Sequence, residues 1–281
     1  MEIFKTKKEI SKKIESLKSE RNSIGFVPTM GTLHKGHLSL IECSANKNDK
    51  TVVSIFINPA QFNDKKDLEN YPRSLDSDLR LLRESKCDII FTPSVNEMYP
   101  EPDNRKFNFG NLDKIMEGKY RPGHFDGVAK IIVRLFEVIS PHKAYFGLKD
   151  FQQLAIIKKL TKDLKFAIQI ISCPTVRESD GLAMSSRNSL LSPEQRKHAA
   201  QIYHTLCQAN INAAENDIDN IKEQVITTLN KIPFTEVEYF EIVDEIDLHP
   251  AENWDNKSGK IGCIAVRIGK VRLIDNIHFN L

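Results

Sequence analysis

Short apolar runs alternate with segments of helical periodicity through about the first 175 residues of this chain. The apolar runs have the length of buried strands and cover residues 24–27, 52–57, 88–91, 144–146 and 167–172. Between them, apolar residues recur at helical spacing over residues 38–45, 75–85, 128–139 and 151–163. Strands that alternate with helices in this way form parallel sheets with helices on both faces. This part of the sequence therefore predicts an α/β domain.

The pattern changes after residue 175. Ser192 and Pro193 have the order of a helix start, with serine as N-cap and proline at the first helical position. Two helical segments, three candidate strands and a possible Gly269-Lys270 hairpin follow, over residues 192–214, 218–229, 237–243, 261–268 and 271–274. We therefore expect two domains, residues 1–176 and a smaller α+β domain of residues 177–281.

Composition narrows the class of function. Apolar residues make up 40% of the chain and charged residues 28%, which suits a sizeable core, and no run is long enough to span a bilayer. The N-terminus lacks an apolar stretch before a cleavage site, so we expect a cytoplasmic protein with no membrane partner. The five cysteines are scattered without a C-x-x-C pair, which argues against a disulfide framework or a structural zinc site.

The charge of the chain gives little support to a nucleic-acid partner. The net charge is only +2. The N-terminus is rich in lysine, but Ile3, Ile10, Ile14 and Leu17 interleave with the lysines at roughly helical spacing. This spacing predicts an amphipathic helix with a solvated basic face, which is common on soluble proteins.

The first motif with clear chemistry is PTMGTLHKGH at residues 28–37, between the first predicted strand and a helical segment. In an open α/β sheet, ligands bind where a strand feeds a helix. Gly31 and Gly36 permit close backbone approach, and a helix start offers N–H donors to phosphate. His34 and His37, three residues apart, would point the same way and donate to a polyphosphate. One capping and one exposed histidine would fit equally, and no G-K-[ST] or E-x-x-H accompanies the pair.

Neutral amides follow the second predicted strand. Asn58 and Gln61 flank Pro59, which we expect to end the strand. Amides can donate to a carboxylate without pairing a full charge against it, so they suit a small hydroxy acid whose carboxylate must stay nucleophilic. A plain polar turn would explain the segment as well.

Cations and hydroxyl groups occur in three further segments. Residues 118–128, with Arg121 and His124, form either an active-site cover or a simple connection. Residues 146–153 place a lysine and an acid at a strand end, which suits phosphate and a helix N-terminus. Residues 177–188 hold phosphate-binding donors at the expected domain junction, or form an ordinary linker. None of these motifs supplies an activated serine or cysteine, so we expect the substrate carboxylate itself to be the nucleophile.

Five segments resemble, in order and spacing, the motif set of the pantoate–β-alanine ligase family. They are PTMGTLHKGH, FINPAQF, RPGHFDGV, GLKDFQQ and DGLAMSSRN, and they span residues 28–188. The length and the smaller second domain also fit, so the resemblance covers essentially the whole chain. It implies a Rossmann-like domain of the HIGH-type nucleotidyltransferase group, a homodimer, and a second domain that forms a lid. It also implies that pantoate and ATP give pantoyl-adenylate and pyrophosphate, and that β-alanine then gives pantothenate and AMP.

The resemblance also implies roles for individual residues. His37 would be the acid with His34 assisting, and Lys149 and Arg187 would stabilise phosphoryl charge. ATP would be bound by Met30, Gly31, Thr32, Leu33, His34, Lys35, Gly36, His37, Gly147, Leu148, Lys149, Asp150, Val176, Met184, Ser185, Ser186 and Arg187. Pantoate and β-alanine would meet Gln61, Gln153, Asn58, Arg121 and His124.

The expected cofactor chemistry is simple: ATP as a substrate, Mg²⁺ on its phosphates, and no tightly bound organic cofactor. Family members carry an acidic or amide metal ligand after the Tyr71-Pro72-Arg73 stretch. Here Asp76 and Asp78 flank Ser77, so the protein ligand of the metal stays unassigned.

Two other classes of function remain to be weighed. An adenylyltransferase that moves AMP onto a phosphate is disfavoured by Gln61 and Gln153, which stand where further cations would bind such an acceptor. A non-catalytic RNA-binding relative of an aminoacyl-tRNA synthetase is disfavoured by the near-neutral charge and by the lack of an anticodon-type domain.

Overall fold

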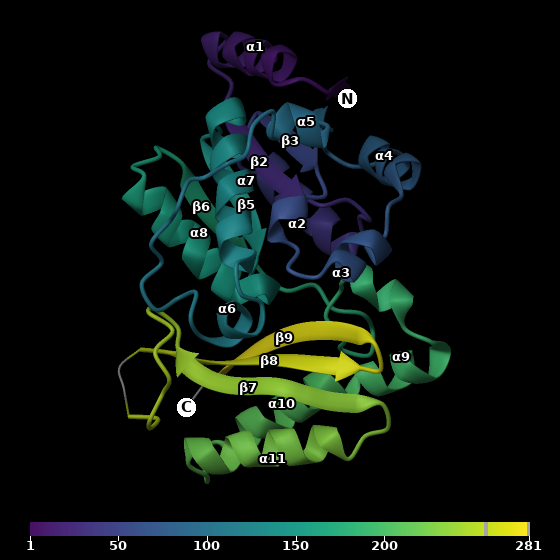
Figure 1. Ribbon diagram of the computed structural model, residues 1–281, viewed down its shortest axis with the longest axis vertical. Helices are drawn as coiled ribbons and strands as arrows, with labels where there is room; N and C mark the ends of the chain where they lie inside the picture. Colours follow the sequence, from purple (N-terminus) through teal and green to yellow (C-terminus); the bar gives the residue numbers. More distant parts are fainter. Residues whose placement is uncertain (256–257, 280–281) are drawn as a thin grey trace. The chain divides into compact units, whose positions relative to one another are not determined.

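The computed structural model describes residues 1–255 and 258–279 and divides the chain into two compact units (Figure 1). The first unit comprises residues 1–148 and 156–174, and the second comprises residues 149–155 and 175–281. The break after Pro174 lies close to the boundary expected from the sequence. The units also differ from the expected domains, because residues 149–155 group with the second unit.

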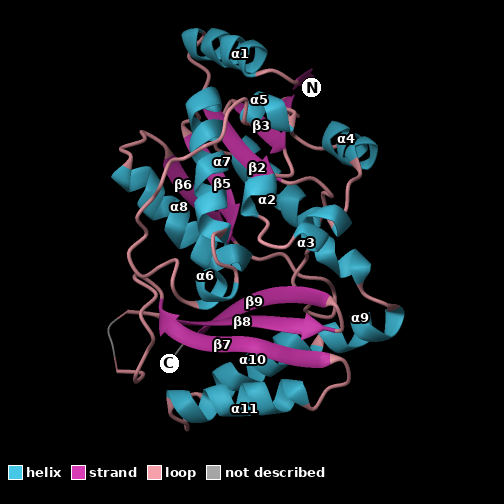
Figure 2. Ribbon diagram, in the orientation of Figure 1, coloured by secondary structure: helices cyan, strands magenta, loops and turns pink. Residues whose placement is uncertain are grey.

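A six-stranded parallel sheet forms the centre of the first unit (Figure 2). Its order is β1-β4-β3-β2-β5-β6, and the strands are β1 (Glu2–Phe4), β2 (Ile24–Thr29), β3 (Lys50–Ile55), β4 (Ile89–Phe91), β5 (Lys143–Gly147) and β6 (Gln169–Cys173). In the sheet, β3 and β4 lie on one side of β2, and β5 and β6 lie on the other side. The strand order therefore reverses between β2 and β5, which is where doubly wound sheets bind ligands. The predicted α/β fold class is confirmed.

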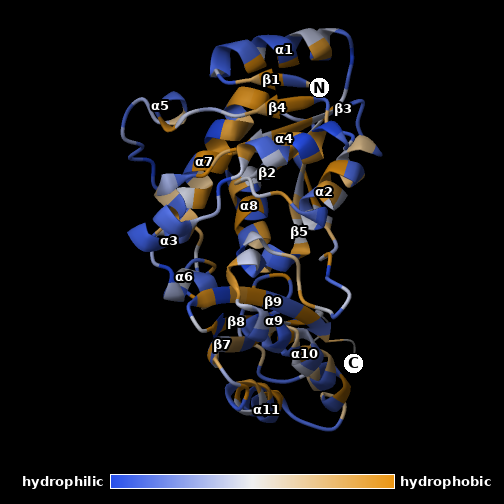
Figure 3. Cartoon of the chain, turned by 90° about the vertical axis from the view of Figure 1, so that its right-hand side faces the viewer, coloured by the Kyte–Doolittle hydropathy of each residue, from blue (hydrophilic) through white to orange (hydrophobic). Residues whose placement is uncertain are grey.

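Helices cover both faces of this sheet. Leu40 and Ile41 of α2 (Lys35–Ala45) pack against Val27 and Val53 on one face, together with residues of α4 (Leu75–Arg83). On the other face, Phe136 of α7 (His124–Ile139) meets Phe26 with a ring separation of 6.4 Å. Apolar residues accordingly gather on α7 and the strands, whereas α3 (Lys65–Asn70) is mostly hydrophilic (Figure 3). The remaining elements of this unit are α1 (Lys7–Ser19), η1 (Pro59–Gln61), α5 (Val95–Met98), α6 (Met116–Tyr120) and most of α8 (Phe151–Asp163), and η2 (Leu148–Asp150) begins in it and continues into the second unit.

The N-terminal prediction is right for the helix and wrong for Ile3. Ile10, Ile14 and Leu17 form the buried face of α1, and Thr6 caps it by accepting from the Glu9 N–H. Ile3 lies instead in β1, which pairs with β4 at the edge of the sheet. The second predicted strand, residues 52–57, is displaced by two residues, because β3 covers Lys50–Ile55 and ends before Pro59. Its partner β2 ends at Thr29, so the pairing stops there.

The second unit contains a three-stranded antiparallel sheet and helices. The strands β7 (Thr235–Asp244), β8 (Lys260–Ile268) and β9 (Val271–Phe279) pair in sequence order, and Gly269 turns the β8–β9 hairpin with a φ of 59°. Ser192 caps α9 (Pro193–Ala199) through a capping box with Gln195, as predicted for the serine. The expected single helix to residue 214 is two helices, because α9 ends at Ala199 and α10 runs from Gln201 to Asn212. With α11 (Ile218–Asn230), α10 buries an apolar face against the sheet.

The cysteines all lie in the described residues and are thiols that form no disulfide. Burial raises the pKa of Cys87 to about 12 and, with the neighbouring Cys43, that of Cys173 to about 12. Because only a thiolate reacts readily, we expect a thiol reagent at about pH 8 to modify half-buried Cys207 long before Cys87 or Cys173. Peptide mapping by mass spectrometry of the folded protein measures this order. Labelling of Cys87 at the rate of Cys207 would contradict the packing described here.

Among the helices in residues 1–255 and 258–279, none combines the length and the apolar composition needed to cross a bilayer.

Candidate active site

The loop between β2 and α2 is held in an unusual backbone conformation by a buried carboxylate. Gly31 and Thr32 both have positive φ values, 82° and 51°. Asp78 of α4 accepts hydrogen bonds from the Thr32 N–H at 2.8 Å and the Leu33 N–H at 2.7 Å. Burial raises the pKa of Asp78, and these two N–H groups oppose that effect. A side chain at Gly31 would be strained by its φ and would lie 3.0 Å from the Asp78 Oδ2 atom, so the loop requires glycine there.

His34 and His37 lie together at the start of α2. Their ring centres are 4.1 Å apart. His34 is the N-cap, and its Nδ1 accepts from the Gly36 N–H at 3.2 Å, while the His37 Nδ1 accepts from the His34 N–H at 3.3 Å. In each neutral ring the proton therefore resides on Nε2, which makes Nε2 a donor. The sequence left capping and ligand binding as alternatives, and the geometry allows both, since capping uses only one nitrogen of each ring.

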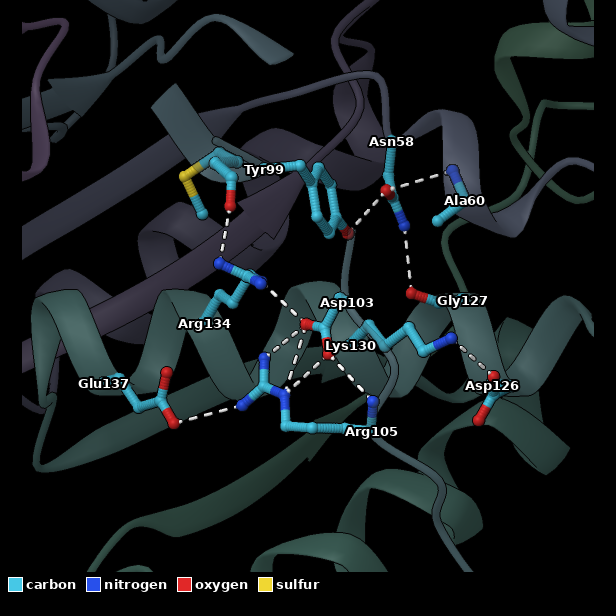
Figure 4. Close-up of polar contacts among 11 residues, drawn as sticks. Asn58, Ala60, Tyr99, Asp103, Arg105, Asp126, Gly127, Lys130, Arg134 and Glu137 are labelled. Carbon is cyan, nitrogen blue, oxygen red and sulfur yellow. Dashed lines mark hydrogen bonds and ion pairs between the residues drawn. The ribbon is translucent and has the colours of Figure 1, made fainter. Parts of the chain in front are cut away.

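Asn58 and Gln61 are buried beside this loop. Asn58 Nδ2 donates to the Gly127 carbonyl at 3.0 Å (Figure 4), and it also donates to the Gln61 Oε1 atom at 3.1 Å. Gln61 Nε2 lies 2.8 Å from the Met30 Sδ atom, which brings the amide to the edge of the β2–α2 loop. Gly127 makes the packing possible, because a Cβ atom there would lie 2.1 Å from the Ala60 carbonyl oxygen.

Arg121 and His124 complete this group. His124 is buried at the start of α7, and its Nδ1 lies 2.8 Å from the Gln61 carbonyl oxygen. Its Nε2 lies 3.1 Å from the Arg121 Nη1 atom. Arginine can only donate, so Nε2 accepts and the proton of the neutral ring is on Nδ1, which donates to Gln61. In the first unit, the structure thus brings together Met30, Asn58, Gln61, Arg121 and His124.

The segment after β5 carries the other predicted phosphate contacts. Gly147 ends β5 and leads into η2, which contains Lys149 and Asp150. The Lys149 Nζ atom lies 3.4 Å from the Asp150 Oδ1 atom, and the lysine side chain is 17% exposed. The Lys149 carbonyl accepts from the Asn276 Nδ2 atom of β9 at 2.9 Å, and this contact lies within the second unit. Gln153 is half-buried two residues into α8.

The loop of residues 175–188 is part of the second unit. The Met184 N–H donates to the Val176 carbonyl at 3.0 Å, and Ser185 caps η3 (Ser186–Leu190) by accepting from the Arg187 N–H at 3.2 Å. Arg177, which the sequence did not single out, donates to Asp275 of β9 at 2.9 Å and stacks over the Tyr203 ring at 3.6 Å. Arg177 therefore ties the loop to β9, the strand that also contacts Lys149.

The described residues offer no group of three or more histidine, cysteine or acidic side chains that would hold a metal ion. Asp76 is exposed on α4, and both oxygens of Asp78 accept from backbone N–H groups.

A cavity of about 440 Å³ borders the β2–α2 loop in the first unit. It is mainly apolar, and its walls include Gly31, Thr32, Phe56, Leu68 and Asp78. Its walls combine residues of the PTMGTLHKGH and FINPAQF motifs with residues of α3, α4 and the segment after β4, which no motif marked.

Comparisons with known proteins agree with the motifs. The family model described as pantoate-beta-alanine ligase matches residues 2–278. Pantothenate synthetase of Bacteroides fragilis is 49% identical over 279 residues, and that of Thermotoga petrophila is 45% identical; the matches cover 99% and 98% of this chain and 99% of each relative.

Solved structures give the same result. Pantothenate synthetase from Thermus thermophilus aligns with a TM-score of 0.92 and 40% identity, over 99% of both chains. Pantoate-beta-alanine ligase from Francisella tularensis, complexed with beta-gamma ATP and beta-alanine, aligns with a TM-score of 0.83 and 36% identity, over 99% of this chain and 97% of that one. With a family match over residues 2–278 and curated relatives that are nearly half identical over their full length, this chain belongs to the pantoate–β-alanine ligase family.

Proposed function

We propose that this chain condenses (R)-pantoate with β-alanine to form pantothenate, with ATP converted to AMP and pyrophosphate. The observation that carries this proposal is the family match over residues 2–278. The β2–α2 loop gives it a physical basis, since it lies at the strand-order reversal and carries two Nε2 donors at a helix start.

In the first step, a pantoate carboxylate oxygen attacks the α-phosphorus of ATP. A P–O bond forms to pantoate, the bond to the bridging oxygen breaks, and pyrophosphate leaves with that electron pair. Negative charge builds on the phosphoryl oxygens, and His34, His37, Lys149 and Arg187 stabilise it. Each well-placed donor of this kind contributes about 2–4 kcal/mol to the transition state. The loop of residues 30–37, the segment 147–150, Val176 and residues 184–187 bind the rest of ATP.

Amides hold the acid in the same step. Gln61 and Gln153 donate to pantoate, and Asn58, Arg121 and His124 support Gln61 through the contacts described above. Because an amide carries no full charge, it orients the carboxylate without reducing its nucleophilicity as an arginine would.

In the second step, the β-alanine amine attacks the acyl carbon of pantoyl-adenylate. The C–N bond forms, the C–O bond to AMP breaks, and the amine loses a proton. The adenylate must be protected from water until then. We assign this role to the segment around residues 118–128 and to the second domain, residues 177–281, acting as a lid over the catalytic domain of residues 1–176.

The proposal also covers the metal ion, the partners, the cellular location and the oligomeric state. Mg²⁺ enters with ATP, bound by its phosphates, and the reaction uses no tightly bound organic cofactor. The partners are the small-molecule substrates, with no nucleic acid or membrane. The protein works in the cytoplasm as a homodimer.

The test is pyrophosphate release. We expect ATP and pantoate to yield pyrophosphate without β-alanine, and AMP to be released only after β-alanine is added. If pantoate elicits no pyrophosphate and a phosphorylated acceptor does, the chain is an adenylyltransferase and the proposal fails.

A further inference from the structure

We propose that Tyr99 is a positioning residue for this reaction: through Asn58, its hydroxyl turns the donor end of the Gln61 amide toward the acid substrate. The inference rests on the proposed function of Gln61 as a substrate contact. The residues that carry it all lie in the first unit and are drawn in Figure 4, apart from Gln61, Met30 and Val95.

Tyr99 is held firmly at the end of α5. Its N–H donates to the Val95 carbonyl at 2.7 Å. The guanidinium of Arg134 lies over its ring, 4.9 Å from the ring centre. Arg134 is itself fixed from two sides, since it donates to Asp103 at 2.8 Å and to the Met98 carbonyl at 2.8 Å. The ring can therefore move little, and its hydroxyl has a defined position.

Asp103 anchors this arrangement. Its side chain is only 4% exposed and accepts from both Arg105 and Arg134. The hydrogen bond from Arg105 holds the pKa of Asp103 well below its usual range, so the carboxylate stays charged. Arg105 also pairs with Glu137 at 3.2 Å. The positive charges of Arg105 and Arg134 are thus matched by the negative charges of two carboxylates next to the Tyr99 ring.

The hydroxyl of Tyr99 fixes which way round the Asn58 amide lies. Tyr99 Oη donates to Asn58 Oδ1 at 2.8 Å, and the Ala60 N–H points to the same atom at 3.3 Å. A backbone N–H can only donate, so this end of the amide must be the oxygen. Burial raises the pKa of Tyr99 to about 12, which keeps its hydroxyl protonated and able to donate.

The orientation of Asn58 then fixes that of Gln61. With its oxygen held by Tyr99, Asn58 presents Nδ2 to the Gln61 Oε1 atom at 3.1 Å. Gln61 must therefore turn its own Nε2 the other way, where it lies 2.8 Å from the Met30 Sδ atom. An inverted Gln61 would offer an oxygen to the substrate carboxylate, and two acceptors repel. Tyr99 thus affects pantoate binding indirectly, through Asn58 and then Gln61.

The direct test is Tyr99→Phe, which removes one oxygen and keeps the ring under Arg134. We expect KM for pantoate to rise about 5- to 10-fold, the factor that one lost hydrogen bond produces, while KM for ATP and the melting temperature stay near wild type. Tyr145→Phe is the matched control, because it also removes a buried hydroxyl, one that accepts from Asn48 at 2.7 Å. It should leave KM for pantoate unchanged.

Two further measurements separate positioning from a general loss of stability. In a Gln61→Ala background, Tyr99→Phe should raise KM for pantoate no further. Independently of any substrate, NMR should show faster hydrogen exchange of the Asn58 side-chain amide in Tyr99→Phe than in wild type. An unchanged KM for pantoate, an equal effect in the Gln61→Ala background, or unchanged Asn58 exchange would each overturn the inference.

Failure of the proposed function has a different signature. In that case the wild-type protein releases no pantoate-dependent pyrophosphate, while the Asn58 exchange rates still report whether Tyr99 orders the amides.

Discussion

Replacing His37 or Lys149 with alanine is expected to lower the rate of pantoate adenylation at least about 100-fold while leaving the fold intact. His37 presents an Nε2 donor at the start of α2, and Lys149 supplies a half-buried ammonium directly after β5. Both are predicted to stabilise charge that develops on phosphoryl oxygens. Their removal should therefore lower the rate of the chemical step. The rate of pyrophosphate formation in a single turnover measures this step.

The controls keep the same residue types at exposed positions. Lys158→Ala, on the solvent side of α8, and His204→Ala, on the solvent side of α10, should react at wild-type rates. Near-normal adenylation by both His37→Ala and Lys149→Ala would refute the assigned roles.

A finer test separates two roles of His37: the hydrogen bond that its Nδ1 accepts at the helix start, and the donation from its Nε2 to phosphate. In asparagine the side-chain amide occupies the place of Nδ1, so it can still accept from the His34 N–H but has lost the distal donor. In glutamine the amide nitrogen reaches the place of Nε2. We therefore expect His37→Gln to retain more adenylation activity than His37→Asn.

The second large effect is expected at Asp78. Asp78→Ala leaves the N–H groups of Thr32 and Leu33 without their acceptor, and we expect the free energy of unfolding to fall by about 2–5 kcal/mol. Adenylation should fall at least about tenfold in the protein that remains folded, because the loop that carries the histidines loses its anchor. Chemical denaturation and the pyrophosphate assay measure the two effects.

Asp76→Ala is the matched control, since this carboxylate is two residues away on the same helix and exposed. It should change neither stability nor rate. If Asp76→Ala instead weakens the response to Mg²⁺ and Asp78→Ala does not alter stability, Asp78 is not the anchor of the loop, and α4 contributes a metal ligand.

Much of the sheet could be predicted from the sequence because its strands are buried on both sides and form continuous apolar runs. The three-residue strand β1 could not, because it is too short to show a period and Ile3 fits the spacing of the following helix. The break between α9 and α10 was also missed. Helical spacing continues across Ala200, which forms part of both caps.

For the candidate site, the sequence could predict which residues lie together only where they are close in the chain. His34 and His37, or Asn58 and Gln61, belong to short motifs at strand ends. Asp78 was considered only as a metal ligand, because its bonds to a loop 45 residues earlier leave no local pattern.

Residues that act through others were missed for the same reason. Tyr99 reaches Asn58 over 41 positions, and Arg177 reaches Asp275 over 98. Such contacts become visible only when the fold brings the two segments together.

The acyl-adenylate is tested most directly by tracing the carboxylate oxygen atoms of pantoate into the products. Pantoate whose carboxylate is enriched in the heavy oxygen isotope is incubated with ATP and β-alanine, and the products are analysed by mass spectrometry. If the carboxylate attacks the α-phosphorus, AMP must carry one heavy oxygen, because the bridging atom stays with phosphorus when the amine displaces it. AMP without the label, or label found in pyrophosphate or inorganic phosphate, would contradict an acyl-adenylate.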